Sequence, residues 1–133
     1  MVKLSAVKTD PDRESGGVWV DWEMGISLKI ARIGNEKFDA MVRKLSEPHL
    51  RSLRQDPNDE KMEEVTRKAV AKHILVGWKN IEDDDGSPLA YSAKRSLDLL
   101  TDPALRDLYK FVLITANNAE LYRREIDEES VGN

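Results

Sequence analysis

The chain has 133 residues, of which 40% are hydrophobic and 35% are charged, and its formal net charge is −4. This length is typical of one folded domain, and so large an apolar fraction argues against intrinsic disorder. The absence of cysteine excludes disulfides, thiol catalysis and thiolate metal sites, and no apolar run approaches the ~20 residues that span a bilayer.

The N-terminal part of the chain is predicted to be an arm followed by a β-hairpin. Residues 1–16 mix proline, glycine and scattered charges, which indicates an extended or flexible segment. The runs 17–23 and 26–33 are rich in β-branched and aromatic residues and surround a glycine, which predicts the hairpin. Trp19 would lie on one face, and the opposite face would be shared by Val18, Val20 and Trp22. A two-stranded hairpin is marginally stable, so we expect it to lie on helices or to pair with another chain.

From Asn35 onward the spacing of apolar residues changes from two to about 3.6, which predicts a helix. Asn35 is a good cap for this helix. Pro48 should end or kink it near Ser46, because proline disfavours helical geometry in the residue before it. A short helix through Leu50 and Leu53 is expected next.

The next helix is predicted from a start signal at Asp56-Pro57, where the carboxylate can cap and the proline needs no amide hydrogen. Gly77 is a plausible stop. The buried face is predicted to consist of Met62, Val65, Ala69, Val70, Ile74 and Val76. After an acidic loop, Ser92 can cap a short leucine-rich helix.

The last helix, over about 103–125, is the strongest predicted element. It begins at a second Asp-Pro pair, Asp102-Pro103. Its apolar stripe is formed by Leu105, Leu108, Val112, Thr115, Ala119, Tyr122 and Ile126. Phe111 and Ile114 add apolar surface beside this stripe, so the middle of the helix is predicted to be buried on most sides.

These elements predict one domain over 1–133, mainly α, in which a small N-terminal β-hairpin packs with about four to five helices. Segment 1–16 is its flexible arm. Segment 126–133 is acidic and is expected to be frayed. No internal repeat and no domain boundary is visible in the sequence.

The acidic loop 82–86 invites a calcium interpretation, because it ends in a glycine that fits the sixth position of an EF-hand loop. The first position is then Ile81 and the twelfth is Ser92, so the pattern lacks its first and last carboxylate ligands. A solvated acidic turn is the better interpretation.

No catalytic, metal or cofactor site is predicted. His49 and His73 have no second histidine at metal-ligand spacing, so structural or surface roles are expected for both. The sequence also lacks a Gly-x-Ser-x-Gly turn and the glycine-rich phosphate loops. The enzyme hypothesis therefore has no positive support.

A helical DNA-binding regulator is the alternative class. Phosphate contacts could come from Arg43, Lys44, Arg51, Arg54, Lys68 and Lys72. Acidic residues are interleaved with them, namely Asp39, Glu47, Glu63 and Glu64. A mixed solvated surface is therefore favoured over a basic face.

Exposed aromatic and apolar residues are the candidates for contact with another protein. Trp22 and Trp78 are expected to anchor the core, whereas Trp19 lies on the opposite face of a thin hairpin. The predicted protein-binding residues are Trp19, Phe111, Ile114 and Tyr122.

Residues 74–122 carry a recognisable set of features. In chain order they are Gly77-Trp78, an acidic loop closing on Gly86, Pro88, Tyr91-Ser92, a leucine-rich helical turn and a long helix with Asn117-Asn118. This stretch resembles the tail assembly chaperones of long-tailed bacteriophages. The detailed likeness covers about the last 60 residues of the chain, and the match before them is loose.

The resemblance implies a non-enzymatic assembly factor in the cytoplasm of the infected bacterium, absent from the mature virion. Such proteins bind the tape measure protein and promote assembly of the tail tube around it. A longer frameshifted form engages the tail tube protein, and this chain would be the short form. Homo-oligomers are expected, and no nucleic acid, membrane or cofactor is expected as a partner.

Overall fold

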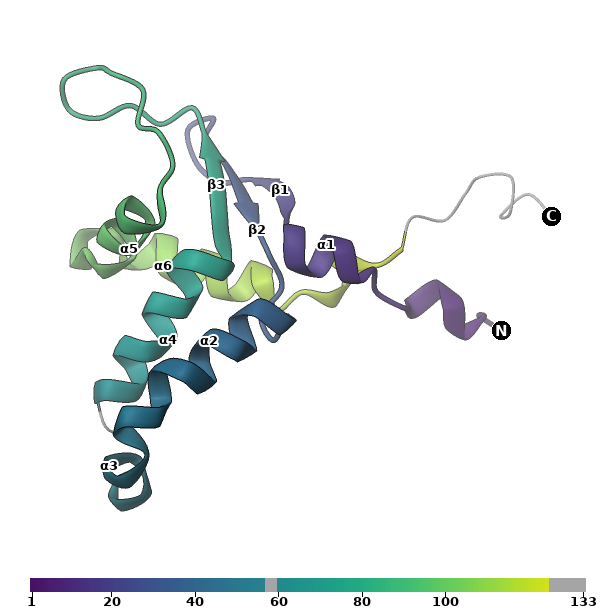
Figure 1. The fold of residues 1–133 in the computed structure, drawn as a ribbon. Helices are drawn as coiled ribbons and strands as arrows, with labels where there is room; N and C mark the ends of the chain where they lie inside the picture. Colours follow the sequence, from purple (N-terminus) through teal and green to yellow (C-terminus); the bar gives the residue numbers. More distant parts are fainter. Residues whose placement is uncertain (57–59, 125–133) are drawn as a thin grey trace.

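The structure, a computed structural model, describes residues 1–56 and 60–124. Its centre is a three-stranded antiparallel sheet in the order β1-β2-β3. The strands are β1 (Val18–Asp21), β2 (Ser27–Ile30) and β3 (Leu75–Lys79). The longer helices are α2 (Glu36–Ser46), α4 (Glu60–His73), α5 (Ala93–Thr101) and α6 (Arg106–Ala116), and the short ones are α1 (Pro11–Gly16) and α3 (Leu50–Gln55). In Figure 1, α2 and α4 lie side by side and extend away from one end of the sheet.

The predicted N-terminal hairpin is confirmed as β1 and β2. Their antiparallel register pairs Val18 with Ile30 and Trp19 with Lys29. Because side chains alternate along a strand, Leu28 and Ile30 point to the inner face, where both are buried, and Trp19 points to the outer face, where it is exposed. The hairpin therefore covers the core with one face and leaves the other open to solvent.

The prediction of a mainly α fold with a separate N-terminal hairpin is wrong, because the hairpin gains a third strand from the second half of the chain. Helix α4 ends at His73, and β3 pairs with β2 instead of continuing the helix toward Val76. A two-stranded hairpin is marginal, and Leu75 and Trp78 become buried by joining it. Strand pairing thus outweighs the helical spacing of this segment, and the fold is mixed α and β.

Three predicted helix starts are confirmed by side-chain hydrogen bonds. The capping residues are Asn35 for α2, Ser92 for α5 and Asp102 for a 3-10 helix at Pro103–Leu105. The prediction for Pro48 is also confirmed, since α2 ends at Ser46 and a new short helix, α3, covers Leu50 and Leu53. The start predicted at Asp56-Pro57 falls partly outside the described residues.

The last helix is shorter than predicted. Helix α6 begins at Arg106 and ends at Ala116, whereas the apolar spacing predicted a helix over about 103–125. The side chain of Asn118 accepts a hydrogen bond from the backbone N–H of Glu120 at 3.2 Å and caps a separate 3-10 helix, Ala119–Tyr122. Asparagine side chains compete with the helix for backbone hydrogen bonds, which accounts for the early end of α6.

Segment 1–16, predicted to be an extended or flexible arm, contains α1 and a 3-10 helix at Leu4–Val7. Its end is joined to the C-terminal segment, because the Arg13 guanidinium donates to the backbone oxygen of Leu121 at 3.1 Å. Figure 1 shows these two segments side by side. The frayed tail predicted at 126–133 lies outside the described residues.

The core lies between the inner face of the sheet and the helices. Its largest members include Leu28, Ile30, Phe38, Val70, Ile74, Leu75, Trp78, Leu100, Leu108 and Val112. Trp78 packs edge-to-face on Tyr91 with ring centres 4.9 Å apart, and the Tyr91 hydroxyl donates to the backbone oxygen of Leu75 at 2.7 Å. Within the described part of the chain, no helix is both long enough and apolar enough to cross a membrane.

Candidate functional site

A groove runs along the flank of α4 that faces α2. It consists of two adjoining hollows with volumes of ≈ 500 Å³ and ≈ 260 Å³, and Lys44 and Leu45 line both. The apolar residues that line it are Ala40, Met41, Leu45, Pro48 and Val65. On α4 the lining extends from Lys61 to His73, which corresponds to about three helical turns. The groove is therefore long enough to accept a short segment of another helix.

The groove is rimmed by positive charge. Its lysines are Lys37, Lys44, Lys61, Lys68 and Lys72. Among the described residues that line it, Glu64 is the one acid, and its carboxylate lies 3.1 Å from the Lys68 ammonium. Burial lowers the pKa of His73 from its ordinary value, and the charges of Lys72 and Lys37 lower it further. The positive potential of the groove at neutral pH therefore comes from its lysines.

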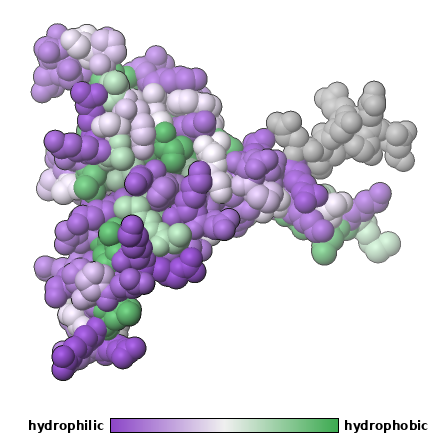
Figure 2. All heavy atoms as spheres, viewed as in Figure 1, coloured by the Kyte–Doolittle hydropathy of each residue, from purple (hydrophilic) through white to green (hydrophobic). Residues whose placement is uncertain are grey.

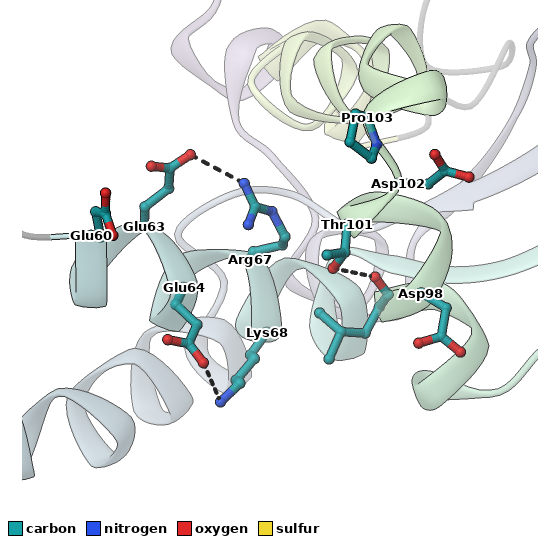
Figure 3. A pocket seen from close by; sticks show the side chains of 10 residues that line it. Glu60, Glu63, Glu64, Arg67, Lys68, Asp98, Thr101, Asp102 and Pro103 are labelled. Atoms are coloured by element: carbon teal, nitrogen blue, oxygen red, sulfur yellow. Dashed lines mark hydrogen bonds and ion pairs between the residues drawn. The ribbon is translucent and has the colours of Figure 1, made fainter.

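The other flank of α4 borders an acidic cleft against the end of α5, with a volume of ≈ 820 Å³ (Figure 3). Its carboxylates belong to Glu60, Glu63, Glu64, Asp98 and Asp102. The Arg67 guanidinium lies 3.1 Å from the Glu63 carboxylate and 5.5 Å from the ring centre of Tyr109. Helix α4 thus lies between a lysine-rich groove and a mainly acidic cleft, and Glu64 and Lys68 border both. The sequence had favoured a mixed surface, because the two flanks alternate along the chain.

Trp19, a predicted protein-binding residue, lies on the outer face of the sheet and is 44% exposed. The ammonium of Lys79 is 4.0 Å from its ring centre and that of Lys29 is 5.9 Å away, so two cations flank the indole. Gly77 lies beneath the ring, since a Cβ at this position would be 3.6 Å from Trp19 Cη2 and 3.3 Å from Lys29 Cβ. The tight contact of such a Cβ would be with Lys29, whereas its contact with the indole would be an ordinary one.

Phe111 and Ile114, the predicted binding residues on α6, lie one helical turn apart. Phe111 is partly buried against Trp22, with ring centres 6.4 Å apart, and Ile114 is 72% exposed. Trp22 directly follows β1, so this part of α6 lies near the end of that strand. Phe111 and Ile114 are thus placed near the β1 margin of the sheet, whereas Trp19 is on its outer face.

Tyr122, the fourth predicted binding residue, is fully buried. Its hydroxyl donates to the backbone oxygen of Ile30 at 3.0 Å, and its own backbone oxygen accepts from the N–H of Asp10 at 2.7 Å. Burial raises the pKa of Tyr122 to about 12. The structure therefore places this side chain among core residues, away from the surfaces that a partner can reach.

The acidic loop 82–86 is held by hydrogen bonds between its own residues and Ser87. One carboxylate oxygen of Asp83 accepts hydrogen bonds from the backbone N–H groups of Asp85 and Ser87, both at 3.1 Å. Within residues 1–56 and 60–124, no cluster of three or more His, Cys, Asp or Glu side chains is placed to hold a metal ion. The histidines stand apart along the α2–α4 groove, where His49 lines one hollow and His73 the other.

Of the five groove lysines, the sequence singled out Lys44, Lys68 and Lys72 as possible phosphate contacts, whereas Lys37 and Lys61 were missed. Lys37 and Lys44 are seven residues apart on α2, Lys61 and Lys68 are seven apart on α4, and Lys72 follows Lys68 by four, about one further turn. Residues seven apart lie on one face of a helix, so each lysine row is visible in the sequence. That the two rows border one groove depends on the packing of α2 against α4.

Comparison with known protein families matches most of the chain. Residues 33–133 match the model of a family described as YdaY prophage protein. No curated protein and no solved structure matches the chain. The matched region begins after the β1–β2 hairpin and contains both helices of the groove.

Proposed function

The chain belongs to the YdaY prophage protein family, so it is of phage origin, and from this premise we propose that it is a tail assembly chaperone. In this proposal it binds a helical segment of the tape measure protein in the α2–α4 groove and promotes assembly of the tail tube. The family match and the resemblance of residues 74–122 to such chaperones both support a phage role.

The groove is the observation that carries the proposal. Its apolar lining, with Met41 and Leu45 on α2 and Val65 on α4, provides the surface that an amphipathic helix buries. The five lysines of its rim select a client whose flanking residues are acidic, because complementary charge steers and orients a partner. Figure 2 shows hydrophobic residues surrounded by hydrophilic ones in the lower part of the view, where α2 and α4 lie in Figure 1.

Helix α6 is a poorer client site than its sequence suggested. Its stripe residues Leu108 and Val112 are buried, and Phe111 packs on Trp22 inside the same domain. Ile114 is the large apolar residue that α6 leaves exposed. The surplus apolar surface of this helix is thus used in folding, which leaves the α2–α4 groove as the better place for a client helix.

The residues that carry the resemblance have structural roles here. Trp78 donates from Nε1 to the backbone oxygen of Leu89 at 2.7 Å, Tyr91 contacts β3, and Ser92 caps α5. They hold the acidic loop and α5 in place next to α4. The resemblance therefore supports a shared architecture, whereas client recognition is assigned to the groove.

The proposal has three further parts. The chain acts by binding and has no catalytic role. It works in the cytoplasm of the infected host and leaves the tail before the virion is complete. A longer frameshifted form, which this chain would accompany, recruits the tail tube protein.

DNA binding is the second candidate, because the five lysines of the groove form the basic surface that such a function needs. Two features favour a protein client. The groove is lined by apolar residues, and its described lining contains no arginine, the side chain that most often reads bases and phosphates. The two candidates differ in their dependence on salt and in their ligand.

Co-purification with the tape measure protein of the same phage tests the proposal. Lys44→Glu reverses the charge at the residue that both hollows share, and it should weaken binding roughly three- to tenfold, as expected for about 0.7–1.4 kcal/mol at a charged rim. The affinity is measured by titrating helical tape measure fragments at about 150 mM salt.

Lys94→Glu is the matched control, because Lys94 is an exposed lysine on α5 outside the groove. It should bind as tightly as the unaltered chain. Equal affinities for the two variants would place the client elsewhere. Retardation of duplex DNA by the unaltered chain that is lost in Lys44→Glu, without tape measure co-purification, would replace the chaperone proposal by the DNA-binding one.

A further inference from the structure

Strand β1 is an open edge of the sheet. It pairs with β2 on one side, and within residues 1–56 and 60–124 the backbone of Val18–Asp21 has no hydrogen bond on its other side. Figure 1 shows β1 as the outermost strand. Its sequence, Val-Trp-Val-Asp, has no proline, and its one charged residue is Asp21. β1 is therefore a template for pairing with another strand.

The opposite edge of the sheet is partly occupied by the chain itself. On β3, the backbone oxygen of Leu75 accepts from the Tyr91 hydroxyl, and Trp78 Nε1 donates to Leu89 in the segment that follows the strand. This segment is itself tied back, because Leu89 N–H donates to Ile81 oxygen at 2.8 Å. The chain itself thus contributes contacts at the β3 edge, and among the described residues it contributes no backbone hydrogen bond at the β1 edge.

The direction of the free backbone groups follows from one hydrogen bond. Trp22 N–H donates to the backbone oxygen of Ile26 at 2.8 Å, so Trp22 points its amide toward β2. Because amides alternate along an antiparallel strand, Val20 also points toward β2, and Trp19 and Asp21 point their N–H and C=O groups toward the open edge.

We infer that β1 pairs with β1 of a second copy of this chain, antiparallel and about a two-fold axis at Val20, to form a continuous six-stranded sheet. In this register Trp19 lies opposite Asp21 of the second copy, and the two residues exchange both of their outward hydrogen bonds. Val20 then lies opposite Val20 as a close, non-hydrogen-bonded pair. The interface is the same on both copies, as a two-fold axis requires.

Charge selects this register over one centred on Trp19. The Trp19 indole is flanked by the ammonium groups of Lys29 and Lys79. A two-fold axis at Trp19 would bring together two such indoles and their four like charges. An axis at Val20 instead brings the Asp21 carboxylate of the second copy beside Trp19 and Lys29, where opposite charges attract.

Apolar surface next to the edge adds to the pairing. Val18, Val20 and Trp22 are only partly buried, and Phe111 lies against Trp22 on the inner side. Ile114 is exposed one turn farther along α6. A second copy at the edge extends the sheet across these residues. The inference is independent of the client groove, because none of these residues lines it.

Engineered cysteines test the register, because the chain has no cysteine of its own. Val20→Cys should form a disulfide-linked dimer under mild oxidation, since a non-hydrogen-bonded pair has Cα atoms about 4.5 Å apart, within disulfide reach. Trp19→Cys alone should cross-link poorly, because the two copies of residue 19 are then about 8 Å apart. A mixture of Trp19→Cys and Asp21→Cys chains should form the mixed dimer.

Cross-linking of Trp19→Cys to itself in preference to Val20→Cys would overturn the register. Sedimentation equilibrium of the full chain tests the pairing without cysteines. Dimers should form at tens of micromolar, Asp21→Lys should weaken them at least tenfold, and Asp21→Lys combined with Lys29→Asp should restore them. Leu50→Ala, at an exposed residue of α3, should leave association unchanged. A monomer throughout this range, or no effect of Asp21→Lys on a folded dimer, would refute the inference.

Discussion

Replacing Tyr122 by phenylalanine and by alanine separates the contribution of its hydroxyl from that of its ring. The ring is fully buried, and loss of a buried aromatic side chain costs about 3–5 kcal/mol. The hydroxyl donates to Ile30 at 3.0 Å, and a hydrogen bond of this kind contributes about 0.5–1.5 kcal/mol net. We expect Tyr122→Phe to lower the free energy of unfolding by about 1 kcal/mol and Tyr122→Ala by about 4 kcal/mol.

Urea unfolding followed by circular dichroism measures both changes, and thermal unfolding provides a second reading. An unfolding entropy of about 2.1 cal/mol/K per residue makes 1 kcal/mol equal to about 4 °C in Tm for a chain of 133 residues. Tm should therefore fall by about 4 °C for Tyr122→Phe and by about 15 °C for Tyr122→Ala.

Met24→Ala is the control for these measurements, because Met24 is almost fully exposed in the turn between β1 and β2. It should leave both quantities unchanged. A loss of less than about 1 kcal/mol for Tyr122→Ala would refute the reasoning, because so small a change is incompatible with a buried ring. Tyr122 would then be available to a partner, as its place on the predicted helical stripe first suggested.

Two further predictions concern the junction of α2 and α4. Asn35→Ala should lower the free energy of unfolding, measured with urea, by about 2 kcal/mol, whereas Ser92→Ala should lower it by about 1 kcal/mol. The reason is that Asn35 caps α2 and also donates to the backbone oxygens of Arg32 and His73 at 2.8 and 3.2 Å. Equal losses of stability for the two variants would contradict this explanation. His73 has a lowered pKa in the folded chain, so its neutral form contributes stability above pH 6.5 that is lost as the pH falls through the folded-state pKa. His73→Gln should flatten this acid-side decline in unfolding free energy, and an unchanged pH profile would show that His73 does not cause it.

Local signals in the sequence determined much of the secondary structure. The caps Asn35 and Ser92, the stop before Pro48 and the β1–β2 hairpin were predictable because each depends on residues close together in the chain. The exposure of Trp19 was predictable for the same reason, since alternation along one strand decides it. The resemblance of residues 74–122 correctly indicated phage origin.

Contacts between distant segments decided the rest. The spacing of Ile74 and Val76 fitted the end of a helix that stops at Gly77, but β2 offered Leu75–Lys79 hydrogen bonds and buried neighbours that a longer α4 would not have. Tyr122 lay on a helical stripe, yet the chain turned at Asn117-Asn118 and placed its ring under β2. Both outcomes depend on pairings more than 40 residues apart, which no local pattern records.

The candidate groove, like the fold, was determined partly by local sequence and partly by tertiary packing. The sequence by itself determined that Lys37 and Lys44, and Lys61, Lys68 and Lys72, lie in rows on their helices, because helical periodicity is local. Only the tertiary structure brought these rows to the two sides of one groove and placed Glu60 and Glu63 on the other flank of α4. The physical reason is that periodicity fixes which residues share a face of one helix, whereas packing decides what each face meets.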